Sequence, residues 1–179
     1  MKTFRCLMLT VLLASFSFAQ ATPAPPPPSN EMFRAPAEQL SWMIGDWEGE
    51  GMLQGEREFI GKMSIVSELD GMALMIHRES MNKTGGASGG RKEIMLIGYD
   101  GTFKKFIATI YTNDGAIVGY VGELKDKELI FSLPPTQTGV VSRRSYTLSA
   151  DGGLSLVIEG AAAGKEVTKQ VEIRFKKKG

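Results

Sequence analysis

The chain has 179 residues, of which 42% are hydrophobic and 23% charged, and its formal net charge is +1. These values fit one globular domain plus some extra sequence, and a near-zero charge without a basic block in the folded region argues against nucleic-acid binding. The chain has a single Cys and a single His. This excludes zinc sites built from several Cys and His ligands, and the usual Cys–His catalytic pairs.

Residues 1–21 are predicted to be a secretory signal peptide. A short basic start precedes an apolar run over residues 7–18, and small residues follow at Ala19 and Ala21, either of which suits cleavage. The only cysteine, Cys6, leaves with this segment. We therefore expect a periplasmic or secreted protein that has no membrane anchor after cleavage of the signal.

Residues 22–35 form a linker that contains five prolines within a short stretch. This stretch has too few apolar side chains to offset the entropy of ordering it, so we expect an extended, disordered tether. A ligand for a proline-recognition domain is the alternative. The folded domain is then expected over residues 36–179, stabilised by its hydrophobic core alone because the mature chain has no cysteine.

Turn signals at regular spacing divide this domain into strands. Asp-Gly, Asn-Asp-Gly and Lys-Asp-Lys sequences supply the positive backbone angles of tight hairpin turns. Ten segments rich in β-branched and aromatic residues lie between them, and they are predicted as strands over 46–54, 57–69, 72–82, 91–100, 103–112, 115–123, 127–133, 138–149, 153–160 and 165–176. Because hairpin-linked strands leave exposed edges unless the sheet closes, we expect an all-β, roughly ten-stranded antiparallel up-and-down β-barrel, with a two-sheet sandwich as the alternative.

A short helix is predicted ahead of the first strand. Pro36 suits the first helical position, the following residues can wind two turns to Ile44, and Gly45 suits the left-handed end of a helix. Apolar residues of this helix would plug one end of the barrel. In the strand that follows, alternation directs Asp46 to water and Trp47 inward. The glycines on the inner face of that strand either relieve crowding at a bent corner or leave room for a ligand.

The sequence LSWMIGDWEGEG over residues 40–51 carries a resemblance to known families. A Gly-x-Trp sequence after a helix resembles the signature of the calycins, the lipocalin and fatty-acid-binding-protein group. The longer string, together with Ile97-Gly98-Tyr99-Asp100, resembles the bacterial domain-of-unknown-function family 1579 and, more distantly, the nitrobindin-like haem proteins. The resemblance covers residues 36–176. It implies that Gly45, Trp47 and Arg174 are structural, with the Arg174 guanidinium stacked on the Trp47 ring to close the barrel end.

The resemblance to nitrobindins also implies haem, and here the sequence departs from the family. Nitrobindins hold the haem iron through a His near the end of the barrel, whereas residues 138–179 contain no His. The lone histidine, His77, is predicted on the same strand face as Met75 and Glu79, where a neutral imidazole could ligate iron. A hydrogen-bonded or surface role is the alternative. We therefore expect no cofactor, with haem as the alternative.

Two predicted strands, 91–100 and 103–112, have apolar residues on both faces. A free-standing barrel in water should instead alternate apolar and polar residues. We therefore expect the outer face of these strands to be covered, by a second subunit in a homodimer or by the N-terminal segment.

The expected function is the binding of a small apolar molecule in the barrel interior. A barrel of this size either holds one ligand or is filled by its own side chains. The candidate ligand-binding residues are Trp47, Met63, Met75, His77 and Tyr111, in part because pliable methionines suit a cavity that accepts apolar molecules. The same methionines suit an ordinary core equally well.

Two further hypotheses concern charged residues. Arg143 and Arg144 could meet a carboxylate group at a barrel mouth, but neighbouring strand residues face opposite ways, so at most one of them enters. His77 and Glu79 share a strand face, which permits a proton-transfer pair in a hydrolase. The alternatives to simple binding are thus a haem-binding enzyme similar to nitrobindins, a hydrolase, and a filled barrel with a structural or interaction role. We assign no catalytic residue and no metal ligand.

Overall fold

The computed structural model describes residues 38–83, 90–134 and 139–179. The predicted signal peptide and linker lie outside the described residues, as does Pro36. Within the described residues no helix is both long and apolar enough to cross a membrane.

The described chain forms ten strands and two single 3₁₀ turns, η1 (Ser41–Met43) and η2 (Leu69–Gly71). The strands are β1 Gly45–Leu53, β2 Arg57–Glu68, β3 Ala73–Asn82, β4 Arg91–Asp100, β5 Lys105–Thr112, β6 Ile117–Lys125, β7 Glu128–Ser132, β8 Val141–Leu148, β9 Leu154–Ala161 and β10 Thr168–Lys177. Their ends differ from the predicted ones by at most three residues. The prediction of ten strands is therefore confirmed.

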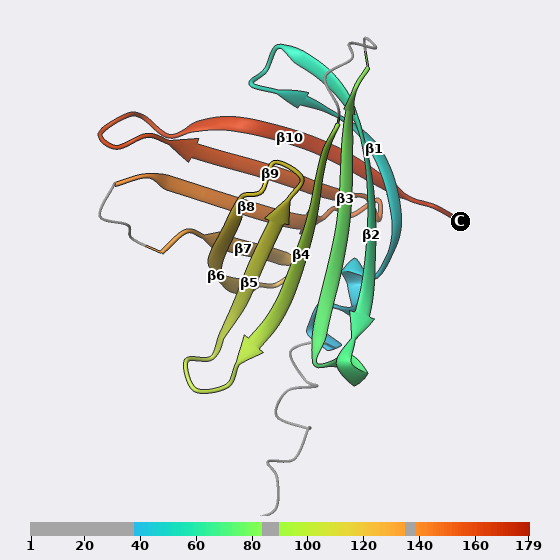
Figure 1. Ribbon diagram of the computed structural model, residues 1–179. Coiled ribbons are helices and arrows are strands. Elements are labelled where there is room, and N and C mark those ends of the chain that lie inside the picture. Colours follow the sequence, from blue (N-terminus) through green and yellow to red (C-terminus); the bar gives the residue numbers. More distant parts are fainter. Residues whose placement is uncertain (1–37, 84–89, 135–138) are drawn as a thin grey trace, which may run out of the picture.

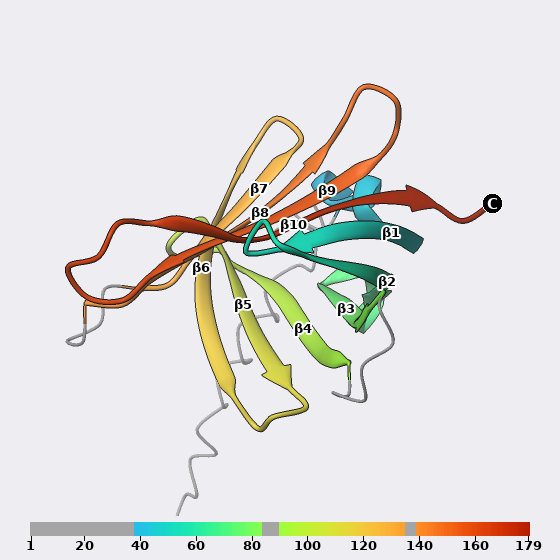
Figure 2. The ribbon, with the colours of Figure 1, turned by 90° about the horizontal axis from the view of Figure 1, so that it is seen from above.

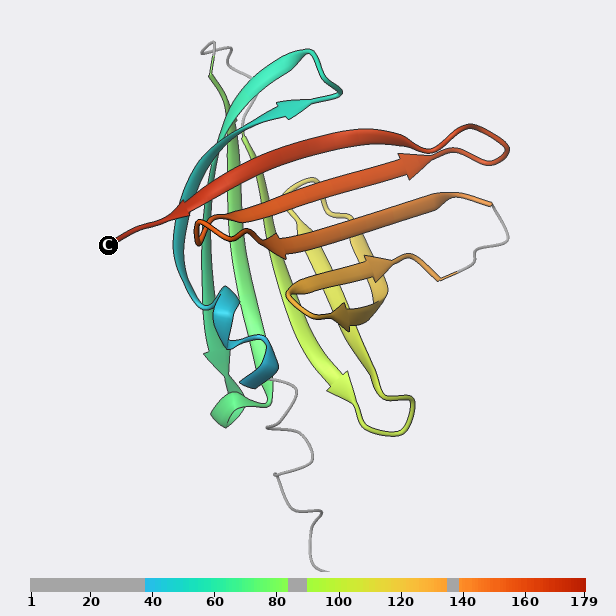
Figure 3. The ribbon, with the colours of Figure 1, turned by 180° about the vertical axis from the view of Figure 1, so that it is seen from behind.

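The ten strands close into one antiparallel barrel. Each strand pairs with its neighbours in the chain, and β1 also pairs with β10. In Figure 1 the steep strands β1–β4 stand in front of β8–β10, which cross behind them, and Figure 3 shows the same crossing from the other side. Seen from above, β4 and β5 fan out to one side and β8 and β9 to the other (Figure 2). The up-and-down barrel is confirmed, and the two-sheet sandwich is excluded.

One end of the barrel, which we call the plug end, is closed by η1. The side chains of Leu40 and Met43 are buried there, and so is Trp47. The Trp47 Nε1 donates a hydrogen bond to the carbonyl oxygen of Met43 at 2.8 Å. Gly45 joins η1 to β1 with φ of +136°, in the region that favours glycine. The predicted two-turn helix is thus reduced, in the described residues, to a short helical turn and η1.

The inner-wall glycines relieve crowding and do not leave room for a ligand. A Cβ at Gly61 would overlap Cδ1 of Ile173, and a Cβ at Gly51 would lie 2.8 Å from side-chain atoms of Ile173 and Phe59. A Cβ at Gly49 would collide with the carbonyl oxygen of Arg174 on the neighbouring strand. The barrel therefore fills these positions with its own side chains.

Candidate functional site

Three charged side chains lie inside the barrel, toward the end opposite η1. Strand alternation points Arg78 of β3 inward with Leu74 and Ile76, and it points Glu93 of β4 inward with Met95. Arg144 of β8 points inward two residues before Tyr146. All three charged residues are at most 5% exposed. Charged side chains this deeply buried are almost always paired with an opposite charge. The contacts among these three residues therefore define the site.

The carboxylate of Glu93 is held by both arginines. Arg144 binds it bidentately, from Nη1 to Oε1 at 2.6 Å and from Nη2 to Oε2 at 3.2 Å. Arg78 donates its Nε proton to Oε1 at 2.8 Å. A third guanidinium, that of the half-exposed Arg91, has its Nε 3.9 Å from Oε2. The buried cluster of Arg78, Glu93 and Arg144 thus has two cations and one anion, and Arg91 adds a third cation at its exposed edge.

Neighbouring side chains fix this cluster in place. The Arg144 Cζ lies 5.7 Å from the centroid of the Tyr120 ring, and the Tyr120 hydroxyl is 3.0 Å from the Ser142 Oγ. The Nη1 of Arg78 donates to the Ser80 Oγ at 3.4 Å. Because the guanidiniums are packed and hydrogen-bonded, their remaining donors point in fixed directions.

The electrostatics follow from burial and from these contacts. Burial alone would raise the pKa of Glu93, but the charges of Arg78 and Arg144 and the hydrogen bonds from both outweigh it, so the pKa lies far below its ordinary value. Burial would likewise lower the pKa of Arg144, and Glu93 outweighs that effect and raises it. Burial raises the pKa of Tyr146. At neutral pH the cluster therefore carries net positive charge.

One donor of the cluster is unsatisfied. Within the described residues, the buried Nε of Arg144 has no hydrogen-bond partner. A buried donor without a partner costs roughly 1–3 kcal/mol, so its presence needs a reason.

Next to the cluster, a pocket of about 210 Å³ opens at the barrel end opposite the plug, which we call the far mouth. The buried Arg78 lines the inner part of the pocket, and the exposed Arg57 and Arg91 line its rim. Its wall also includes the apolar side chains of Leu53, Phe59 and Val171. Among the described residues, its lining includes no Asp, Glu, His or Cys. The pocket therefore combines an apolar wall with an excess of positive charge, since three arginines line it and the one carboxylate of Glu93 contacts two of them.

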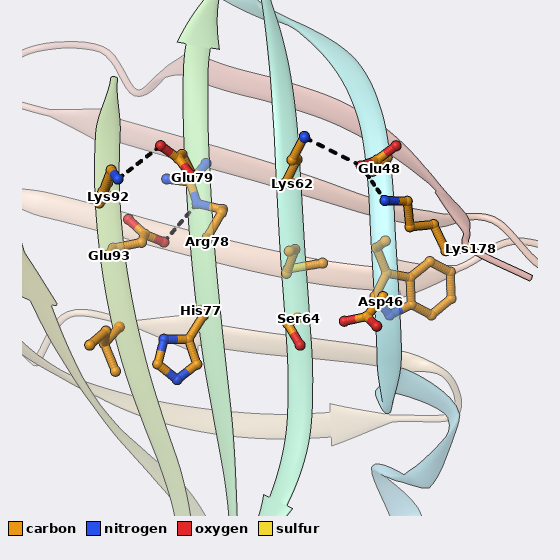
Figure 4. Close-up of a pocket in the computed structure, with 13 residues that line it drawn as sticks. Asp46, Glu48, Lys62, Ser64, His77, Arg78, Glu79, Lys92, Glu93 and Lys178 are labelled. Atoms are coloured by element: carbon orange, nitrogen blue, oxygen red, sulfur yellow. Dashed lines mark hydrogen bonds and ion pairs between the residues drawn. The ribbon is translucent and has the colours of Figure 1, made fainter. Parts of the chain in front are cut away.

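A second depression, of about 470 Å³, lies on the outer wall of β1–β4 (Figure 4). Asp46, Ser64 and His77 stand beside one another on β1, β2 and β3, in agreement with the strand register. The charges beyond them are already paired with one another: Glu48 contacts Lys62 at 3.6 Å and Lys178 at 2.7 Å, and Glu79 contacts Lys92 at 3.0 Å. This surface has little unpaired charge for a ligand, so the far mouth is the stronger candidate.

The structure divides the five predicted ligand-binding residues between the two sides of the barrel wall. Trp47 and Met63 point into the interior and are buried. Met75, His77 and Tyr111 point outward, so the prediction that they line the interior is wrong. The physical reason is that Ala73, Leu74, Met75 and Ile76 form an apolar run, which leaves the strand phase ambiguous. Closure of the barrel directs Leu74, Ile76 and Arg78 to the inside.

The predicted stacking of Arg174 on Trp47 is also wrong. Arg174 lies opposite Glu50 and is exposed on the outer face of β10. Lys177 lies opposite Trp47 instead, and its Nζ is 5.5 Å from the Trp47 ring centroid. A residue of the last strand does lie over the tryptophan. It is Lys177 and not Arg174, because successive residues of a strand face opposite sides and Arg174 faces outward.

The outward position of His77 bears on the alternative functions. The only histidine of the chain cannot ligate a haem iron inside the barrel, so the residues present do not fit haem held there by a histidine. Glu79 shares the outer face with His77, as alternation predicted, but it is paired with Lys92. In the part of the chain that the structure describes, no group of three or more His, Cys, Asp or Glu side chains could hold a metal ion.

Sequence reasoning missed Arg78 and Glu93 and found Arg144 in part. The rule that at most one of Arg143 and Arg144 enters the barrel agrees with the structure, where Arg144 is buried and Arg143 faces outward, 3.9 Å from Glu159. Arg78 and Glu93 could have been found in the sequence, because each is a charged residue that alternates with apolar residues on one strand face. Arg78 follows Leu74 and Ile76, and Glu93 precedes Met95 and Ile97.

Comparison with known proteins supports the fold. No family model matches the chain, and no curated protein matches its sequence. Among solved structures, the crystal structure of Rv2717c from M. tuberculosis matches with a TM-score of 0.59 at 15% sequence identity, covering 80% of this chain and 98% of that chain. At this identity the likeness shows a common barrel fold and nothing about activity.

Proposed function

We propose that the protein is an exported, calycin-like binding protein that takes up a small molecule with an apolar body and an anionic group at the far mouth of the barrel. The observation that supports this is the pocket lined by Arg57, Arg78 and Arg91, with apolar side chains in its wall and no carboxylate among the described residues that line it. A guanidinium binds a carboxylate or phosphate through parallel, charge-assisted hydrogen bonds. The apolar wall would receive the body of the ligand.

Glu93 positions the binding group and does not compete for it. Its carboxylate faces Arg78 and Arg144 from within and holds the Arg78 guanidinium beside the pocket. Since three guanidiniums surround this one carboxylate, the cluster keeps capacity for a second anion. An anion bound in this partly buried site would interact more strongly with it than with an exposed arginine, because the local dielectric is lower.

The pocket volume limits the ligand. About 210 Å³ corresponds to roughly seven water molecules at their liquid volume. This is smaller than the cavities of about 300–1,000 Å³ that hold drug-sized ligands. The proposal is therefore for a short amphipathic anion such as a carboxylate. It is for binding and not for catalysis, because the described residues that line the pocket include no general base of the Asp, Glu or His type.

Calorimetric titration tests the proposal with paired probes. Straight-chain carboxylates of about four to twelve carbons are compared with primary alcohols of the same length, which match the apolar body and lack the charge. We expect the carboxylates to bind and the alcohols to bind at least about tenfold more weakly. Equal affinity for both, or no binding of either, contradicts an anion site and favours a filled barrel with a structural role.

Two variants locate the binding. The double variant Arg57→Gln/Arg91→Gln removes the rim charges, which are exposed or half-exposed, and leaves the buried cluster intact. It should weaken carboxylate binding by about tenfold or more. The matched control is Arg143→Gln, which removes an outward arginine and should leave the affinity unchanged. Loss of affinity in both would indicate a general charge effect and would contradict a site at the far mouth.

A further inference from the structure

The outer face of β4–β6 carries a group of exposed apolar side chains that the proposed binding site does not use. These are Ile94, Leu96, Ile107, Tyr111, Ile117 and Val121, each between 37% and 67% exposed. We call this group the apolar wall. It lies on the opposite side of the sheet from the barrel interior.

The strand register makes the apolar wall continuous. Ile94 lies opposite Tyr111, and Tyr111 lies opposite Ile117. In the next row Leu96 lies opposite Thr109, which lies opposite Gly119, and in the row after that Ile107 lies between Gly98 and Val121. Side chains directly opposite one another on the same face are in contact distance, so the rows form one surface. Monomeric soluble proteins rarely expose contiguous apolar surface of this kind, and where it occurs it commonly marks a contact site.

Two glycines, Gly98 and Gly119, lie among the side chains of the apolar wall, and neither crowding nor a positive φ requires glycine there. A Cβ built on Gly98 or Gly119 meets no heavy atom within 4 Å, in contrast to the inner-wall glycines, and neither residue has positive φ. Glycine within a strand weakens it, and it often marks a bulge, a tight bend or a place where another backbone approaches closely. The pairing around Gly98 and Gly119 has no bulge. Gly98 lies next to Ile107 in the register, so this close approach would occur on the apolar wall itself.

Charges of both signs border the apolar wall, and two of the lysines are paired with glutamates. Lys92 contacts Glu79 at 3.0 Å, and Lys105 contacts Glu123. Two copies of this face would therefore meet without strong repulsion between like charges. The balance of signs also gives no attraction to an anionic membrane surface, which would need an excess of Lys and Arg.

We infer that the apolar wall is the centre of a homodimer interface, in which β4 and β5 of one copy pack against β4 and β5 of a second copy about a two-fold axis. An apolar centre surrounded by a polar, charged rim is the usual arrangement of such interfaces. The inference is independent of the proposed ligand, because the two sites lie on opposite sides of the sheet.

The mass of the purified protein in solution tests this inference, measured by light scattering and sedimentation velocity over roughly micromolar to 100 μM concentrations. Two variants target the apolar wall. Leu96→Lys places a charge at its middle, and Gly98→Arg fills a position that is open in the single chain. The matched control is Val141→Lys, since Val141 is an apolar strand residue of similar exposure, 46% against 42% for Leu96, on β8.

The wild type and Val141→Lys should have the mass of two chains, whereas both apolar-wall variants should dissociate, with a dissociation constant raised about 100-fold. Circular dichroism verifies that each variant is folded, and Gly98→Arg keeps the test decisive if Leu96→Lys does not fold. A wild type with the mass of one chain throughout overturns the inference. So does equal dissociation of Val141→Lys and the apolar-wall variants, which would place the contact elsewhere.

Discussion

The two halves of the barrel interior are built from different chemistry. Toward the plug end, Met43, Trp47, Ile65 and Phe175 are packed together with almost no exposed surface. Toward the far mouth, the interior holds Arg78, Glu93 and Arg144, with Ser80 and Ser142 hydrogen-bonded beside them. The first half is an ordinary hydrophobic core, and the second is a polar network that opens into a pocket.

The two halves therefore contribute differently to the stability of the protein. Apolar packing contributes to stability in proportion to the area it buries. A buried ion cluster contributes little net stability, because removing charges from water offsets their attraction, and apolar residues of similar volume often serve as well. Stability alone therefore does not account for the cluster in the mouth half, and its position beside the pocket supports the proposed binding function.

The largest effect is expected from breaking the cluster. Arg144→Met removes the bidentate partner of Glu93 and leaves a buried carboxylate with one direct cation, so the free energy of unfolding should fall by about 3–5 kcal/mol. Urea denaturation measures this. Arg143→Met is the control and should change stability by less than about 0.5 kcal/mol, since its pair with Glu159 is at the surface. Equal effects would contradict the assignment of Arg144 to the interior.

The triple variant Arg78→Met/Glu93→Leu/Arg144→Met separates the contribution of the cluster to stability from its contribution to binding. It replaces every member of the cluster by an apolar side chain and leaves no charge unpaired, so most of the stability lost in Arg144→Met should return. It should also no longer bind carboxylates. Recovery of stability together with retained binding would contradict the proposed site.

In the apolar half, substitution of a strand glycine is expected to have the next largest effect on the free energy of unfolding. Gly49→Ala places a methyl group against the carbonyl oxygen of Arg174 and should lower the free energy of unfolding by about 1–3 kcal/mol. Gly98→Ala is the matched control on the outer face, where the methyl group meets nothing within the single chain; measured at concentrations too low for the proposed dimer, its free energy of unfolding should be unchanged or raised by about 0.5 kcal/mol. Thermal unfolding of both variants checks whether inner and outer glycines differ in this way.

The pH dependence of stability reports on Glu93. The pKa of this carboxyl is lowered in the folded state, so folding favours its ionised form; this stabilisation is complete above the unfolded pKa and is lost as the pH falls. The difference in unfolding free energy between wild type and Glu93→Gln should be constant from about pH 7 to 5 and should narrow by roughly 1–2 kcal/mol by about pH 3. A constant difference down to that pH would mean that Glu93 is not held ionised.

The smallest effect is expected at the plug end, where Lys177 lies over Trp47. Lys177→Ala removes this contact and should lower the free energy of unfolding by about 0.5–1 kcal/mol. Arg174→Ala, on the outer face of the same strand, should have no measurable effect. If Arg174→Ala were the more destabilising of the two, Arg174 and not Lys177 would be the residue that packs on Trp47, as the resemblance to calycins implied.

The sequence determined the ten strands, their hairpin order and the barrel. Turn residues and strand-forming segments are local features, and the hairpin spacing of this chain leaves closure as the simplest way to remove exposed edges. The sequence also indicated that Trp47 faces inward, because acidic residues alternate with it on β1. For Arg143 and Arg144 it gave the parity rule, though it could not say which of the two enters.

Only the tertiary structure decided which face of β3 and β5 lines the interior. Both faces of these strands contain apolar residues, so alternation alone could not assign the phase, and Met75, His77 and Tyr111 were placed on the wrong side. The cluster itself joins residues 15 and 51 positions apart in the chain, Arg78 with Glu93 and Glu93 with Arg144. Their meeting depends on the strand register and on closure of the barrel across its interior, which no local pattern encodes.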